Sequence, residues 1–163
     1  LKLQPSSIDN VSDYVNSLTL LSSKQKEYFI KICNSVKQSA SLNELEDKIN
    51  KLLHQLANDQ TMEGKSKMTI AFSAGVAKYS YIYWANAKVN KNNPYYIIKR
   101  EQNADNYYPI FSCSELVDIG AMGQAYNYYL SGGYTPAQAQ TAAIQDGAYN
   151  SGLANLPGGS CGL

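Results

Sequence analysis

One stretch of this chain, from Ser41 to Asn58, constrains the fold more than any other. Its apolar residues recur at spacings of three and four, which is the period of one face of an α-helix. These residues are Leu42, Leu45, Ile49, Leu52 and Leu56. Ser41 and Glu44 add the S-x-x-E pattern of a capping box at the beginning of the stretch. The start signal and the periodicity therefore predict the same helix.

Comparable helix signals recur along the whole chain. The segments expected to be helical are residues 8–18, 22–36, 41–58, 68–88, 112–131 and 135–152. With 163 residues, the chain is long enough to bury one core without a disulfide or a metal. We therefore predict an all-α, single-domain bundle of about six helices over residues 1–163.

The segment 68–88 differs from the others in being apolar on nearly all sides. This pattern is typical of a central helix surrounded by its neighbours. The side chains expected to be largely buried are Phe72, Val76, Tyr79 and Trp84. Lys78 and several tyrosine hydroxyls argue against a membrane span, so membrane insertion is not expected.

The C-terminal part carries the signals of a helical hairpin. Gly132-Gly133 ends the helix expected over 112–131, since glycine takes a left-handed terminal position without steric cost. Thr135, Pro136 and Gln138 then reproduce the start signature of the next helix. Residues 153–163 are expected to form a tail.

A long, tyrosine-rich excursion interrupts the helical pattern between Val89 and Cys113. Connections of this length are commonly functional or partly ordered by strands of their own, and Tyr95 to Ile98 has β propensity. The candidate binding residues are Tyr95, Tyr96, Tyr107 and Tyr108. Exposed tyrosines offer a large contact area at low entropic cost. The alternative is that these rings simply cover the open end of the bundle.

The balance of charges disfavours nucleic acid as a partner. Charged residues make up 17% of the chain and the formal net charge is +1, so no basic footprint exists. Arg100 is the only arginine, although bidentate phosphate and guanine contacts favour arginine. The fourteen tyrosines suit contact with proteins or glycans, or they reflect the codon bias of an AT-rich genome.

Few residues are candidates for catalysis or metal binding. His54 is the only histidine and falls away from the apolar seam of its helix, and no zinc-ligand spacing occurs, so we expect no metal and no cofactor. Glu101 and Asp105 are four residues apart in the excursion. Glu115 and Asp118 lie near the start of the helix over 112–131, where negative charge favours the helix dipole without any catalytic role.

The three cysteines indicate in which cellular compartment the protein works. Cys33 falls on an apolar helix face, whereas Cys113 and Cys161 lie outside helix interiors and are the favoured disulfide pair. The chain opens Leu1-Lys2-Leu3 without an initiator methionine, and we expect a removed export signal upstream. Reduced thiols in the cytosol are the alternative.

These observations lead to a functional expectation that rests on the absence of recognisable chemistry. We expect an exported, non-catalytic helical domain that binds a protein or a cell-surface glycan through the tyrosine-rich excursion. The first alternative is a carboxylate-based hydrolase or lyase that sets Glu101 or Asp118 against tyrosines in a cleft. The second is a membrane-active effector that uses the helix over 68–88.

Overall fold

The computed structural model describes residues 11–96 and 113–155, and the predicted all-α bundle is confirmed for these residues. Within these ranges the chain forms no strand. The helices are α1 (Val11–Asn16), α2 (Ser23–Lys37), α3 (Leu42–Asn58), α4 (Gly64–Val89), α6 (Cys113–Ser131) and α7 (Pro136–Asn155).

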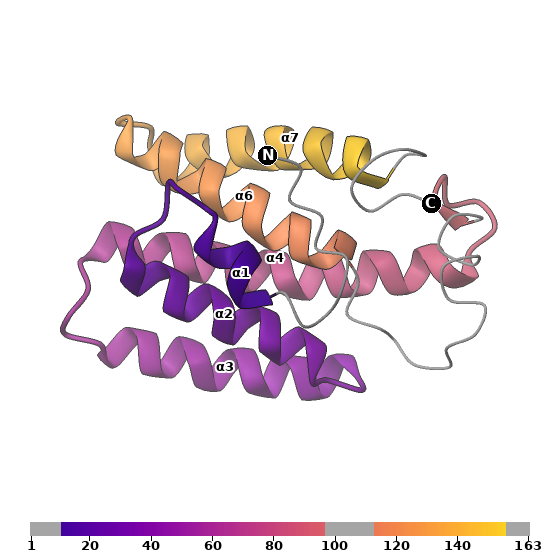
Figure 1. The fold of residues 1–163 in the computed structure, drawn as a ribbon, viewed down its shortest axis with the longest axis horizontal. Coiled ribbons are helices and arrows are strands. Elements are labelled where there is room, and N and C mark those ends of the chain that lie inside the picture. Colours follow the sequence, from indigo (N-terminus) through magenta and orange to yellow (C-terminus); the bar gives the residue numbers. More distant parts are fainter. Residues whose placement is uncertain (1–10, 97–112, 156–163) are drawn as a thin grey trace.

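Helix α4 lies in the middle of the bundle (Figure 1). Helices α2 and α3 pack on one side of it and α6 packs on the other. Helix α7 packs against α6 as the outermost layer, and it barely contacts α4. Helices α4 and α7 therefore flank α6 without packing against each other.

The starts of α2 and α3 follow their sequence signals. Ser22 accepts a hydrogen bond from the backbone N–H of Gln25, and the Gln25 side chain accepts one from the Ser22 N–H. Ser41 likewise accepts from the Glu44 N–H, but the Glu44 carboxylate accepts from Ala40 instead of Ser41. At α3 the first hydrogen bond of the capping box is therefore present, whereas the second has its donor at Ala40, one residue before Ser41.

The apolar seam of α3 and the facing side of α2 supply a large part of the core, which also contains side chains of α1, α4 and α6. The fully buried side chains of these two helices include Phe29, Ile32, Cys33, Val36, Leu45 and Ile49. Cys33 is buried as a free thiol, as predicted, and this burial raises its pKa to about 12. His54 lies exposed on α3, also as predicted.

Helix α4 is central, but the prediction of its buried side chains is wrong in part. Trp84 is buried, Phe72 and Val76 are half-buried, and Tyr79 is 77% exposed. The face of α4 that packs on its neighbours carries mostly small side chains, among them Ala74 and Ala77, which are fully buried. Tyr79 lies on the side that faces the gap between α4 and α7, where no described helix covers it.

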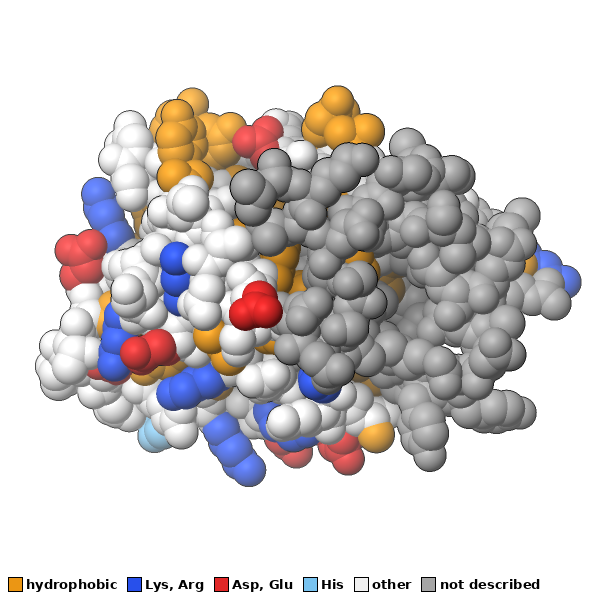
Figure 2. Space-filling view, in the orientation of Figure 1, with side chains coloured by type: hydrophobic (Ala, Val, Ile, Leu, Met, Phe, Trp, Pro, Cys, Tyr) orange, Lys and Arg blue, Asp and Glu red, His pale blue; other side chains and the backbone are white. Residues whose placement is uncertain are grey.

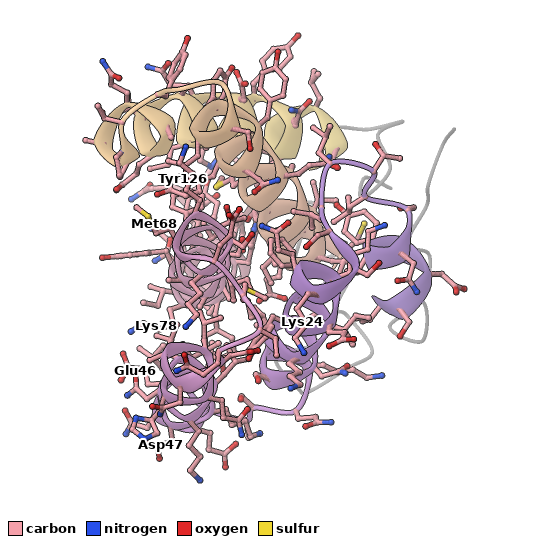
Figure 3. All side chains as sticks on the ribbon, turned by 90° about the vertical axis from the view of Figure 1, so that its left-hand side faces the viewer. Lys24, Glu46, Asp47, Met68, Lys78 and Tyr126 are labelled. Atoms are coloured by element: carbon pink, nitrogen blue, oxygen red, sulfur yellow. The ribbon has the colours of Figure 1, made fainter. Side chains whose placement is uncertain are left out.

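Helices α4 and α6 approach closely at one point. A Cβ atom on Gly123 would lie 2.1 Å from the Ser73 hydroxyl oxygen and 2.6 Å from the Phe29 ring, so only glycine fits. Beyond this point the Phe72 and Tyr126 rings stack, with centroids 4.4 Å apart. Figure 3 shows Tyr126 and Met68 together at this α4–α6 contact. Tyr126 therefore packs against α4 and also shares a buried cluster with Ala139 and Ala143 of α7.

The α6–α7 hairpin has the predicted turn. Gly133 has φ of +91°, and the N–H of Tyr134 donates to the Tyr129 carbonyl, which closes the end of α6. Thr135 and Gln138 exchange hydrogen bonds as a complete capping box. Helix α7 continues to Asn155, so residues 153–155, which the sequence assigns to a tail, are helical.

The contact between α6 and α7 uses small residues at every fourth position of α7. The buried residues of this seam are Ala139, Ala143, Gly147 and Ser151. A Cβ atom on Gly147 would lie 1.9 Å from Cγ of Met122, so the two helices meet closely there. Because only this narrow seam is buried, most of the α7 surface is exposed.

Candidate binding groove

The gap between α4 and α7 forms a groove with a volume of about 590 Å³. This volume lies within the range of ligand sites in proteins. Helix α4 supplies one wall with Ala71, Phe72, Gly75, Val76, Tyr79, Ser80, Tyr83 and Trp84. Helix α7 supplies the other with Gln140, Ile144, Ala148, Ser151 and Gly152, while Asp118 and Met122 of α6 line the base and Tyr95 lines one end.

The helical repeat explains why these residues share one groove. The α4 positions recur at spacings of about four, which keeps them on one face of that helix. Ile144, Ala148 and Gly152 form the corresponding row on α7. Both lined stretches are about 20 Å long at 1.5 Å per residue. The site is consequently an elongated trough.

Small residues give the groove its depth. Apart from its chain neighbours and the backbone of its own helix, no described atom lies within 4 Å of the position that a Cβ atom on Gly75 would occupy, because this position opens into the groove. Ala71 and Ala148 keep the two walls thin. Gly75 therefore leaves room in the groove, in contrast to Gly123, which is needed for helix packing.

One carboxylate lies at the base of the groove. Asp118 is 5% exposed, and its Oδ2 accepts hydrogen bonds from the Ser80 hydroxyl at 2.6 Å and from the Trp84 indole N–H at 2.7 Å. The sequence suggests a helix-dipole role for Asp118 in the first turn of its helix. In the structure Asp118 lies beyond that turn and ties α6 to α4.

Of the four predicted tyrosines, Tyr95 lines the groove. Its ring contacts the Trp84 ring edge-on, with centroids 5.3 Å apart, and a Cβ atom on Gly152 would lie 3.3 Å from its hydroxyl. Tyr96 is half-buried and does not line the groove. Tyr107 and Tyr108 lie outside the described residues. Residues 91–95 form turns and a bend, so no strand begins at Tyr95.

The groove also contains two tyrosines that the sequence does not single out as ligand-binding residues. Tyr79 is 77% exposed and Tyr83 is 44% exposed. Burial raises the pKa of Tyr83, and the charge of Asp118 adds to this rise, while a hydrogen bond with Asn93 acts in the opposite direction. Tyr83 is therefore a neutral phenol near pH 7 and cannot serve as a phenolate base there.

The hydrolase or lyase alternative stays a prediction, because Asp118 lines the groove together with Tyr79, Tyr83 and Tyr95 but no second carboxylate of the described residues does. Asp118 is the one described carboxylate that lines the groove, and Glu115 does not line it. Glu101 and Asp105 lie outside the described residues. Within residues 11–96 and 113–155, no group of three His, Cys, Asp or Glu residues could hold a metal ion. Among the helices described, none combines the length and apolarity needed to cross a bilayer.

Comparisons with known proteins give no independent lead. No family model, no curated protein and no solved structure matches this chain. The groove itself is therefore the feature from which a function can be inferred.

Sequence reasoning missed most of the groove. Gly75, Ile144 and Gln140 carry no motif, and they meet only because α4 and α7 both pack on α6. One signal was available in the sequence. Helix α7 has a single charged side chain, Asp146, in 20 residues, which is unusual for a helix exposed on most of its surface.

Proposed function

We propose that this chain is a non-catalytic binding domain that holds an apolar segment of a protein partner in the groove between α4 and α7. The apolar and aromatic lining of the groove carries the proposal. A glycan would need many hydrogen-bonding groups, and apart from tyrosine hydroxyls the lining offers few polar side chains, namely Ser80, Asp118, Gln140 and Ser151. The lining therefore favours an apolar ligand over a sugar.

We further propose that the domain works in an oxidising compartment, as an exported protein does. Cys113 is disulfide-bonded and Cys33 is free. Disulfides persist in secreted and periplasmic proteins and are rare in the cytosol. The predicted partner, Cys161, lies outside the described residues.

The single tryptophan makes the groove directly testable. Trp84 is the only tryptophan of the chain and lines the groove, so its fluorescence reports on occupancy. We expect the neutral apolar probe N-phenyl-1-naphthylamine to bind in the groove. Quenching of the Trp84 emission should then rise with probe concentration and reach a plateau.

Two glycine substitutions on α4 provide a matched pair for this test. Gly75→Leu adds a side chain whose Cβ atom lies in open space in the groove, whereas the Cβ atom added by Gly64→Leu lies in open space outside it. We expect Gly64→Leu to bind the probe as the wild type does and Gly75→Leu to bind at least about tenfold more weakly, a loss of about 1.4 kcal/mol. Equal probe binding by both variants would show that the groove is not the site.

A further inference from the structure

Charge is distributed unevenly over this molecule. Helices α2 and α3 carry lysines and carboxylates along their outer faces, and Lys78 of α4 pairs with Glu46 of α3 at 4.0 Å (Figure 3). Helices α6 and α7 contain no lysine or arginine. Figure 2 shows most of the blue side chains low in the view, where α2 and α3 lie, and orange side chains along the upper edge, where α7 lies.

Of the three acidic side chains of α6 and α7, only Asp146 is exposed. Glu115 and Asp118 are buried. The carboxylate of Asp146 accepts a hydrogen bond from the Tyr129 hydroxyl at 2.6 Å. The outer side of the hairpin is consequently almost neutral.

Exposed large apolar side chains are concentrated on α4 and the α6–α7 hairpin, and Tyr79, Tyr83 and Ile144 among them line the groove. The described residues include ten exposed large apolar side chains, and all except Leu20 lie on α4, α6, α7 or the turn between α6 and α7. Depletion of charge together with enrichment in tyrosine is typical of the centre of a protein–protein interface.

This surface contains a projection and a matching recess. Tyr79 projects from α4 with 77% of its surface exposed, and Gly75, one turn earlier on the same helix, opens into the groove. A two-fold axis would bring Tyr79 of each copy to Gly75 of the other, because in an isologous contact residue i meets residue j and j meets i. Neutral faces can meet in this way without charge repulsion.

The size of the face is sufficient for such a contact. Helix α7 is about 30 Å long, and two adjacent helices present a face about 20 Å wide, so each copy can bury about 600 Å². Two copies would bury about 1,200 Å² together, which is the lower limit for specific, stable interfaces.

We infer that a second copy of this chain occupies the groove, with Tyr79 of each copy inserted beside Gly75 of the other across a two-fold axis. This inference rests on the proposed function, since it names the partner of the same groove.

Sedimentation equilibrium of the purified chain from about 1 µM to about 1 mM tests the inference, because interfaces near the lower size limit are commonly weak. We expect a reversible monomer–dimer equilibrium. Gly75→Leu and Tyr79→Ser should each raise the dissociation constant at least about tenfold. The matched controls Gly64→Leu and Tyr149→Ser, which change α4 and an exposed tyrosine outside the groove, should leave it unchanged.

A chain that stays monomeric over the whole range would overturn the inference, as would a dimer insensitive to both groove variants. The naphthylamine probe separates this failure from failure of the proposed function. A monomer whose Trp84 emission is quenched by the probe, with loss of quenching in Gly75→Leu, would retain the groove as a binding site and exclude the second copy. A monomer that does not bind the probe would contradict both.

Discussion

At the scale of single residues, two glycines on facing helices have opposite roles. Gly123 of α6 lies where a Cβ atom would collide with Ser73 and Phe29, whereas Gly75 of α4 has open space in front of it. Both are inside helices, where glycine costs about 0.5–1 kcal/mol relative to alanine. Packing therefore explains glycine at position 123, and only the groove explains it at position 75.

Alanine at these two positions should change stability in opposite directions. Gly123→Ala forces the Phe29 ring or the helix axes to move and should destabilise the protein by about 1–3 kcal/mol. Gly75→Ala should stabilise it by about 0.5–1 kcal/mol through the backbone entropy of the unfolded chain. Urea unfolding of both variants measures the difference, and a stable Gly123→Ala protein would contradict the close α4–α6 contact.

Asp59, which follows α3, makes stability depend on pH. Hydrogen bonds from the Thr61 and Tyr28 hydroxyls and from the Thr61 N–H hold the pKa of its carboxyl well below the usual range, and Lys24 adds to this effect. Since the pKa is lowered in the folded state, the unfolded chain binds the proton first as the pH falls. The stability that Asp59 contributes is present above a pH of about 4 and is lost below it.

Asp59→Asn should therefore weaken the acid sensitivity of folding. We expect the wild-type urea midpoint to fall more steeply than that of Asp59→Asn as the pH is lowered from about 5 to about 3. The variant should be the less stable protein at neutral pH. Parallel pH profiles for the two proteins would mean that folding does not lower the pKa of Asp59.

At the scale of elements, α6 is attached to α4 by a buried polar contact as well as by packing. Asp118 accepts from both Ser80 and Trp84 of α4. Replacing Asp118 by alanine leaves these two donors without this acceptor, which should cost about 1–3 kcal/mol for each unsatisfied group.

Asp118→Asn is the matched control, because its amide oxygen can accept the same hydrogen bonds. We expect Asp118→Ala to be clearly less stable than Asp118→Asn and to show a changed Trp84 emission spectrum in the folded state. If the two variants have equal stability, the acceptor oxygen does not hold α6 against α4.

The beginning of α7 offers a second test at this scale. Thr135→Ala removes the side-chain acceptor for the Gln138 N–H and should destabilise the protein by about 0.5–2 kcal/mol. Thr141→Ala, which changes an exposed threonine inside the same helix, serves as the control and should have a small effect. Thermal unfolding followed by circular dichroism measures both, and equal melting temperatures would rule out a capping role for Thr135.

At the scale of the whole molecule, the state of the cysteines shows where the chain is cross-linked. Cys113 is disulfide-bonded at the beginning of α6, and Cys33 is a buried free thiol. The pairing of Cys113 with Cys161 stays a prediction, because Cys161 lies outside the described residues.

Alkylation of the purified protein should label one thiol in denaturant without reductant and three after reduction. In the native state Cys33 should not react, because burial raises its thiol pKa to about 12 and excludes the reagent. Peptide mapping should identify the Cys113–Cys161 bridge. A bridge that includes Cys33 would contradict both the pairing and the buried position of Cys33.

The sequence by itself determined the features that depend on neighbouring residues. The start signals at Ser22 and Thr135 act within one helical turn, and the seam of α3 depends on the helical period alone. These features could be predicted because hydrogen bonds and periodicity within a turn need no knowledge of the rest of the fold.

The tertiary structure decided which surfaces are covered. Tyr79 and Trp84 are both large aromatic residues on an apolar helix, and the sequence predicts that both are buried. Tyr79 is exposed and Trp84 is buried because of where α6 and α7 lie around α4. The same arrangement makes the groove, since Gly75 and Ile144 come from distant parts of the chain. Of the two predicted tyrosines that the structure describes, Tyr95 lines this groove and Tyr96 does not. The composition of a loop can indicate a binding surface, but it cannot show which helices will leave a gap next to that loop.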